Sequence, residues 1–569
     1  MAKKSASSQR KHRPINVRRQ LQKLQPHDAS WRLNFTGIVV GLVFFCVSHT
    51  PSLLPVAPLF QGAIAGISFA VGYGLGVALS WTVRLLVGKE LPAAVKSAAW
   101  WLVRIATPVL AIAYSIWAAS WQNSVRSIMG EPALVERHIA ESLAIAVVVG
   151  TLCVTAGRLI AWAIRRVSTF VSKWIPARLS IGVGIVVVGV VLYWVYSGIL
   201  VTAFVKVTND IYRNNNAKTN AHATKPQDML HAGGNGSLIS WDSLGRQGRN
   251  FIGRGPSQQQ ITDFSGIPAK QPIRVYAGLD SADAPKSRAQ LAVRELKRTG
   301  AFERKVLCVI TPTGTGWIEP QSADSLEYMW NGDTALVAMQ YSYLPSWISF
   351  LVDQQNAVEA GQELFDAVYQ EWQQIPSGER PKLIVYGLSL GAYGGQGAFS
   401  GADDLQNRTD GALFVGSPSH SQPWLRFTEG RDAGSPEWQP VYQSGRAVQF
   451  AANEKDIAAT QSRWQGSRTL YLQHASDPVV WWNTKLILQK PGWLAPRGDD
   501  ISPNMRWYPF VTFFQTSADQ LFATSVPAGH GHNYSDVIVA AWATITQPEQ
   551  WNHEKTAHLQ QIINSYAIE

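Results

Sequence analysis

The sequence predicts two structural parts, a bundle of membrane-spanning helices followed by a mostly parallel sheet flanked by helices. Long apolar stretches are confined to the first 206 residues, and strand-like and helical patterns alternate from residue 271 onward. Charge also differs: residues 1–205 hold 20 Lys and Arg against 5 Asp and Glu, and the remainder holds 30 against 34. We therefore divide the 569 residues as follows: a basic cytoplasmic tail (1–30), five spans (31–206), a linker or clasp (207–270) and an α/β domain (271–569).

Five stretches are apolar and long enough to be considered as membrane spans, each of which needs about 20 residues as a helix. They are residues 33–47, 62–87, 99–121, 142–164 and 179–205, and the first is the shortest. A cleavable signal peptide is not expected, because the preceding basic arm is long and four more spans follow.

Basic residues mark alternate connections between these spans. The N-terminal arm and the second and fourth connections are rich in Lys and Arg, whereas the first connection is uncharged and the third is nearly balanced. The positive-inside rule then predicts a multi-pass protein of the cell membrane whose second half is extracytoplasmic. Because the positive charge flanks apolar spans and no recognition motif accompanies it, we expect no nucleic-acid partner.

Two further segments, a glycine-rich stretch of the second span and the polar stretch after the last span, lie before the α/β domain. Gly72, Gly74 and Gly76 lie inside the second span, where small residues four apart favour close helix packing over nucleotide binding. The polar stretch 209–270 is typical of a linker. Within it, residues 240–242 and 245–249 are candidates for an ordered clasp, to which spacing alone assigns no chemistry.

From residue 273 onward, short β-rich runs alternate with helical patterns, as in a sheet covered on both faces. The predicted strands are residues 273–277, 305–310, 334–340, 382–386, 411–415, 448–451 and 469–473, and helices are predicted at 287–299, 357–372 and 536–545.

A candidate nucleophile, Ser389, lies in the motif Gly387-Leu-Ser-Leu-Gly391 directly after the strand at 382–386. A serine on a tight strand-to-helix turn adopts strained backbone angles and needs small neighbours two residues away on either side. The segment that follows is rich in Gly and Ala, which suits a helix packed closely on the sheet. This context favours the nucleophile of an α/β-hydrolase domain over a plain glycine turn.

Such a serine needs an imidazole to accept its proton, and in this fold the chain order is Ser, acid, His. The acid candidate is Asp477, which follows a strand, although an Asp-Pro turn is the competing interpretation. Two histidines, His530 and His532, precede the last helix. We favour His532 as the base and keep His530 as the alternative; a zinc pair is less favoured, since no third ligand is visible nearby.

The developing oxyanion needs prearranged N–H donors. One is expected from Leu390 and the second from Thr313 or Gly314 in the glycine-containing loop after the second strand. Aromatic residues of such a domain are more often core than binding surface, yet a tethered domain could use them as an acyl groove or interfacial lip. The substrate-binding candidates are Trp317, Tyr343 and Trp481.

Six motifs together resemble the actinobacterial membrane-anchored α/β-hydrolase family. They are residues 50–55 (TPSLLP), 274–278 (RVYAG), 313–317 (TGTGW), 340–347 (QYSYLPSW), 387–391 (GLSLG) and 529–532 (GHGH). The resemblance implies a multi-span region joined to an esterase-like domain. Relatives often carry a polar residue where Leu388 stands, so substrate contacts there are expected to differ.

The expected function is that of a membrane-anchored serine hydrolase of the esterase or lipase class. Its partners would be membrane lipids or lipid-linked esters of the cell envelope, and it would need neither a metal nor another cofactor. An acyltransferase with the same triad and a non-catalytic membrane scaffold are the alternatives.

Overall fold

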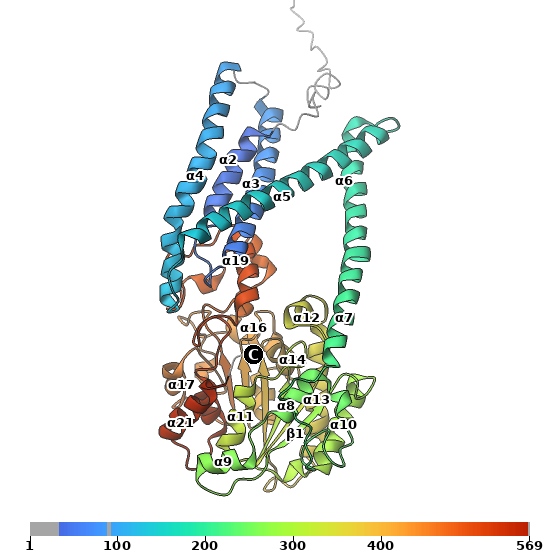
Figure 1. The fold of residues 1–569 in the computed structure, drawn as a ribbon, viewed down its shortest axis with the longest axis vertical. Helices are drawn as coiled ribbons and strands as arrows, with labels where there is room; N and C mark the ends of the chain where they lie inside the picture. The colour runs from blue at the N-terminus through green and yellow to red at the C-terminus, as the bar shows by residue number, and fades with distance from the viewer. Residues whose placement is uncertain (1–32, 88–92, 567–569) are drawn as a thin grey trace, which may run out of the picture.

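The computed structural model describes residues 33–87 and 93–566, and the predicted basic tail, 1–30, lies outside them. Figure 1 shows long helices standing on one side of an α/β domain. The helices of the first part are α2 (Phe35–Val47), α3 (Pro58–Val87), α4 (Ala93–Ile128), α5 (Glu136–Val171), and a continuous helix of α6 (Ala177–Trp194), η1 (Val195–Val201) and α7 (Thr202–Asn216).

Four of the described helices are long and apolar enough to cross a membrane, at Pro58–Arg84, Ser97–Ile128, Glu136–Val171 and Leu179–Asn216. The structure differs from the predicted five spans at α2, which has 13 residues. At 1.5 Å per residue α2 is about 20 Å long, shorter than the roughly 30 Å of a bilayer core.

Helix α3 packs on α2 through glycines, as the sequence predicted. A Cβ on Gly72 would lie 2.8 Å from Phe44, and one on Gly76 would lie 2.5 Å from the carbonyl oxygen of Thr36. A Cβ on Gly74 would meet nothing within 4 Å. The packing prediction is therefore confirmed for the two glycines that lie four residues apart, since only residues without a side chain permit so close an approach.

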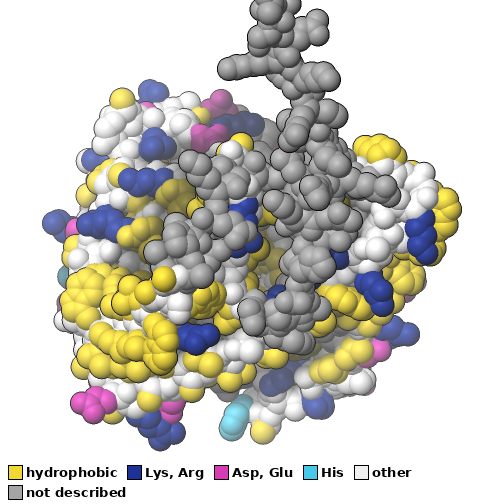
Figure 2. Space-filling view, turned by 90° about the horizontal axis from the view of Figure 1, so that it is seen from above, with side chains coloured by type: hydrophobic (Ala, Val, Ile, Leu, Met, Phe, Trp, Pro, Cys, Tyr) yellow, Lys and Arg dark blue, Asp and Glu magenta, His cyan; other side chains and the backbone are white. Residues whose placement is uncertain are grey.

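The outer faces of the long helices are apolar and exposed. Seen from the end that carries these helices, hydrophobic side chains cover much of the visible surface, with Lys and Arg among them (Figure 2). Exposed apolar surface of this extent marks a contact with lipid or with a partner. Examples are Trp101, Leu102, Val148, Val186 and Leu200.

The second part is built on a seven-stranded parallel sheet in the order β1-β3-β2-β4-β5-β7-β6. Nearly every strand residue is buried, as in a sheet covered on both faces. All seven predicted strands are confirmed. The strands are β1 (Ile273–Ala277), β2 (Val306–Thr311), β3 (Thr334–Met339), β4 (Lys382–Leu388), β5 (Gly411–Val415), β6 (Val448–Ala451) and β7 (Arg468–Leu472).

Two groups of helices cover the sheet: α10, α13 and α14 pack together, as do α11, α20 and α21 (Figure 1). The predicted helices at 287–299, 357–372 and 536–545 correspond to α10, α13 and α20. The α-helices of this part and its linker are α8 (Gly245–Gly253), α9 (Gln258–Ser265), α10 (Pro285–Arg298), α11 (Pro320–Met329), α12 (Ser346–Val352), α13 (Gln354–Trp372), α14 (Leu390–Gln396), α15 (Ala402–Arg408), α16 (Gln422–Glu429), α17 (Glu454–Thr460), α18 (Pro478–Trp481), α19 (Val511–Asp519), α20 (Ile538–Thr546) and α21 (His553–Asn564). Short helices are η2 (Asp242–Leu244), η3 (Ala301–Glu303), η4 (Gln443–Gly445), η5 (Thr484–Ile487), η6 (Gly492–Leu494) and η7 (Gln520–Phe522).

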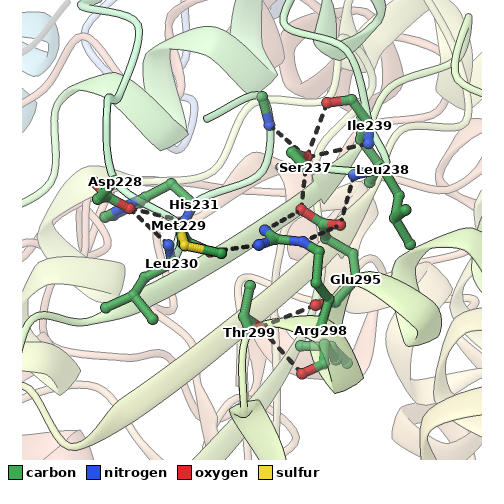
Figure 3. A network of polar contacts seen from close by, with 12 residues as sticks. Asp228, Met229, Leu230, His231, Ser237, Leu238, Ile239, Glu295, Arg298 and Thr299 are labelled. Atoms are coloured by element: carbon green, nitrogen blue, oxygen red, sulfur yellow. Dashed lines mark hydrogen bonds and ion pairs between the residues drawn. The ribbon is translucent and has the colours of Figure 1, made fainter. Parts of the chain in front are cut away.

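The linker is ordered and docked on the α/β domain. Its Ser237 hydroxyl and Leu238 amide donate to the two oxygens of the buried Glu295 carboxylate on α10, at 2.6 and 2.9 Å (Figure 3). Arg298 completes the contact, because its guanidinium pairs with Glu295 and donates to the carbonyl oxygen of Met229 at 2.7 Å. A charged cluster thus holds the linker in place.

The loop between α2 and α3 inserts into the α/β domain. Leu53 and Leu54 are fully buried in the main core. The Ser52 hydroxyl and the Leu53 amide donate to Asp519 on α19, and burial raises the pKa of Asp519 to about 7. The loop between the apolar helices α2 and α3 and the α/β domain therefore share one hydrophobic core.

Candidate active site

Ser389 stands on a strained turn between β4 and α14. Its backbone has φ 57° and ψ −123°, a region that residues other than glycine rarely adopt. The Ser389 amide donates to the carbonyl oxygen of Val415 on β5 at 2.8 Å. A Cβ on Gly387 would lie 2.4 Å from the Gly391 carbonyl oxygen, and one on Gly391 would lie 2.2 Å from that of Thr311. Crowding explains both glycines of the motif.

Asp477 and His532 meet in the interior, just past the carboxyl end of β7. The Nδ1 atom of His532 lies 2.7 Å from Oδ2 of Asp477, and both side chains are buried. The other carboxylate oxygen accepts from the Val479 amide at 2.8 Å, so Asp477 also caps helix α18. The predicted acid therefore reaches the imidazole, and the competing Asp-Pro turn takes the form of a helix start, because separate oxygens of Asp477 make the two contacts.

Tyr534 is a further residue of the site, which the sequence did not predict. Its hydroxyl donates to Oδ2 of Asp477 at 2.6 Å and accepts from the His474 amide at 3.1 Å. The two rings of His474 and Tyr534 stack at 4.2 Å. Tyr534 stands two residues after His532 in the sequence. Nothing in this short stretch indicates that its side chain reaches the carboxylate of Asp477.

Gly416 brings the imidazole to the turn that carries Ser389. A Cβ on Gly416 would lie 2.2 Å from Cε1 of His532, and this glycine directly follows Val415, the acceptor for the Ser389 amide. The Nε2 atom of His532 is buried and makes no hydrogen bond with any described residue, Ser389 included. Catalytic hydrogen bonds are often long before substrate binds.

His530, the alternative base, lies in different surroundings. Its Nδ1 atom is buried without a hydrogen-bond partner in the described chain, and burial lowers the pKa of its imidazole. Gly529 and Gly531 both have positive φ, at 84° and 52°, so the backbone reverses on each side of His530. The structure thus joins His532, and not His530, to Asp477.

The structure differs from the predicted oxyanion loop at Thr313. The Thr313 amide donates to the Trp317 carbonyl oxygen at 3.0 Å, which closes the loop. This amide is therefore not free to donate to an oxyanion. The Gly314 amide donates to the Ser346 hydroxyl at 3.2 Å, a partner that can rotate away. The Leu390 amide at the start of α14 makes no hydrogen bond to another described residue, as expected of the first helical N–H groups.

A cavity of about 710 Å³ opens beside His532 and is also lined by Trp317 and Leu388. The structure corrects one other substrate-binding prediction, Trp481, whereas Tyr343 stays a prediction. Neither Tyr343 nor Ser389 is among the residues that line this cavity, and the Tyr343 hydroxyl donates to Asp280 at 2.6 Å. Trp481 is fully buried in the core. Its indole donates to a backbone carbonyl, so packing accounts for this side chain.

Glu319, which lines the cavity together with Asp324, was not anticipated. One of its oxygens accepts from the Ser322 hydroxyl at 2.5 Å and from Tyr386 at 3.4 Å. Burial raises the pKa of Glu319, and the nearby His532 opposes this shift. The sequence offered no signal beyond a Glu-Pro step before a helix, which is common at helix starts.

Replacing Gly416 with alanine is expected to lower the reactivity of Ser389 at least about 100-fold, because the new Cβ would overlap the His532 ring. Gly416 also has φ +56°, which alanine tolerates poorly. Labelling of Ser389 by a fluorophosphonate probe and thermal unfolding are measured together. Gly434→Ala, at a positive-φ glycine with open space around it, is the control for backbone strain alone. Equal losses in the two variants would contradict the expectation.

Similar proteins identify the family of both parts of the chain. Residues 273–559 match the model of the alpha/beta-hydrolase family, and residues 49–256 match the model of that family's N-terminus. No curated protein matches the chain. Among solved structures, Trichoderma reesei cutinase in complex with a C11Y4 phosphonate inhibitor is similar at 13% identity, over 42% of this chain and 84% of that chain. Its TM-score is 0.19, too low to bear on fold or function. The two family matches show that this chain belongs to the alpha/beta-hydrolase family.

Proposed function

We propose that the chain is a membrane-anchored serine hydrolase that cleaves an acyl ester of a membrane lipid. The observation that carries this proposal is the buried hydrogen bond between His532 and Asp477. The His532 ring packs on Gly416, next to the strained turn of Ser389. A strained serine, an oriented imidazole and a buried carboxylate are the parts that activated serine nucleophiles require.

The chemistry follows from these positions. The Oγ atom of Ser389 attacks the ester carbonyl as Nε2 of His532 takes its proton, and the Leu390 amide stabilises the oxyanion. Collapse of the tetrahedral intermediate releases the alcohol, which receives the proton from His532. Water, deprotonated by the same imidazole, then attacks the acyl group, and His532 returns that proton to Oγ of Ser389 as the acid leaves. Asp477 holds the Nδ1–H tautomer and balances the imidazolium charge throughout.

Two features support a lipid as the source of the ester. Helix α12 begins at Ser346, which lines the cavity, and exposes Trp347, Leu351 and Val352. In Figure 1 this helix lies on the side of the α/β domain that faces the membrane helices. Exposed tryptophan and aliphatic side chains favour the interface between lipid and water. We infer that α12 is a lip over which an amphiphilic ester enters.

The position of the charged connections supports an extracytoplasmic domain. The uncharged α2–α3 loop touches the α/β domain, whereas the connection with Arg165, Arg166 and Lys173 lies at the other end of the helices (Figure 1). Under the positive-inside rule the basic end is cytoplasmic. The proposed location is therefore the outer face of the plasma membrane, which requires the short α2 to cross as well.

A fluorophosphonate probe tests the proposal. Wild-type protein in detergent is expected to be labelled, and Ser389→Ala to give less than about 1% of that labelling, because the probe reacts only with an activated serine. Ser400→Ala, at an exposed serine outside the site, should be labelled like wild type. Absence of labelling in folded wild-type protein would favour a non-catalytic scaffold and contradict the proposal.

A further inference from the structure

The cavity beside His532 is lined by the loop after β2 and also by helix α8 of the linker. Its volume of about 710 Å³ lies within the range of small-ligand sites. The linker was expected to act as a clasp without chemistry, yet its helix shares this cavity with the imidazole. The α8 residues that line the cavity follow the spacing of one helical face: Arg246, Gln247, Asn250, Phe251 and, at the helix end, Arg254.

The orientation of α8 is set by its other face. A Cβ on Gly248 would lie 2.5 Å from the Tyr276 ring on β1, so the helix is pressed against the sheet. Arg249 is buried and donates to the carbonyl oxygens of Asn216 and Lys218 at 2.9 and 2.7 Å. With these contacts fixed, the polar face cannot turn away from the cavity.

The polar side chains on this face hydrogen-bond to one another, and several of their hydrogen-bond donors have no partner among the described residues. The Nε atom of Arg246 donates to Oδ1 of Asn220 at 2.8 Å, and Nδ2 of Asn250 donates to Oε1 of Gln247 at 3.2 Å. The terminal nitrogens of Arg246 and the side-chain nitrogens of Asn220 and Gln247 make no hydrogen bond within the described residues. Groups that are oriented in advance bind a ligand with little loss of entropy.

We propose that this face of α8 binds the alcohol half of the ester, and that this half is rich in hydroxyl groups, as a sugar or another polyol is. The inference rests on the proposed hydrolase function and names its substrate class. Hydroxyl groups both donate and accept, which matches a wall of amides and a guanidinium. Trp317 lines the same cavity and offers a flat apolar surface to a sugar ring.

Other occupants fit less well. An acyl chain placed here would leave Arg246, Asn220 and Gln247 without partners, a desolvation cost that proteins avoid. An anionic group such as a phosphate would meet Arg246 and Arg254 but also two acidic residues, Glu319 and Asp324, that line the same cavity. The acyl half is left with the apolar lip at α12. The substrate is thus amphiphilic, with its polar end toward the linker.

The test compares two esters with the same acyl chain, 6-O-octanoylglucose and methyl octanoate, on the full-length protein in detergent. Wild type is expected to prefer the glucose ester by kcat/KM. Gln247→Ala and Arg246→Ala should each lower this preference about fivefold or more. Gln259→Ala, an exposed glutamine on α9 outside the cavity, should keep the wild-type preference. A ratio within one variant is insensitive to partial misfolding, which lowers both rates.

Three outcomes would overturn the inference. The first is a wild-type protein that does not prefer the glucose ester, and the second is a preference unchanged in Gln247→Ala and Arg246→Ala. The third is a stronger preference for octanoyl glycerol phosphate that only Arg246→Ala abolishes, which would identify an anion site. Ester turnover that persists in Ser389→Ala would instead overturn the proposed hydrolase function, so the two failures are distinguishable.

Discussion

Asp477→Asn is expected to lower kcat for a soluble ester by about 10⁴-fold while leaving KM nearly unchanged. An amide at this position offers Nδ1 of His532 either a donor or a neutral acceptor, so the imidazole is held in the wrong tautomer or loses charge compensation. The geometry need not change, because asparagine fills the same space. Steady-state hydrolysis at several pH values measures the effect.

Tyr534→Phe is the matched control for Asp477→Asn. It removes the other hydrogen bond to Oδ2 of Asp477 but leaves the carboxylate and its bond to His532 in place. We expect a loss of about 10- to 100-fold, the usual cost of one hydrogen bond to a charged group. If Asp477→Asn lost no more than Tyr534→Phe, Asp477 would be a helix cap and not the orienting acid.

Leu54→Ala is expected to destabilise the whole protein by about 2–5 kcal/mol, as removal of a fully buried leucine does elsewhere. Leu54 belongs to the loop between α2 and α3 but packs into the α/β core, where its Cδ2 atom would lie 3.2 Å from a Cβ on Gly531. Gly531 immediately precedes His532. A cavity at this point would loosen the loop that carries the imidazole, so the rate of fluorophosphonate labelling should fall as well.

The stability of Leu54→Ala is measured by chemical unfolding in detergent, beside Leu59→Ala as control. Leu59 lies on α3, five residues further along, and is 57% exposed. Its replacement should change stability by no more than about 0.5 kcal/mol. If Leu54→Ala were equally mild, the α/β domain would not depend on the loop between α2 and α3.

Much of the fold could be predicted because its signals are local. The strand at 273–277 and the one at 411–415 are runs of β-branched, aromatic and small apolar residues that end where the structure ends them. The turn at Ser389 could also be predicted from the sequence. The glycines two residues before and after it are required because a Cβ at either position would clash with nearby backbone atoms. Helix α12 and the helices α8 and α9 of the linker were missed, because each is nine residues or shorter and too brief to show a helical period.

The catalytic surroundings could be predicted only in part. Ser389, Asp477 and His532 were proposed from their order along the chain, but the choice between two nearby histidines depends on which ring reaches a carboxylate 55 residues away. Thr313 fits an oxyanion loop by composition, yet its amide is used inside the loop. Trp481 belongs to the core, since burial depends on what packs around a residue and not on its type.

By itself, the sequence determined the division into apolar helices and an α/β domain, the seven strands and the strained serine, because periodicity and glycine spacing act over a few residues. Only the tertiary structure decided that His532 meets Asp477, that the loop with Leu54 enters the catalytic core, and that helix α8 lines the cavity. Those contacts join segments far apart in the chain. Packing and buried hydrogen bonds select them, and no local pattern records which distant partner will be met.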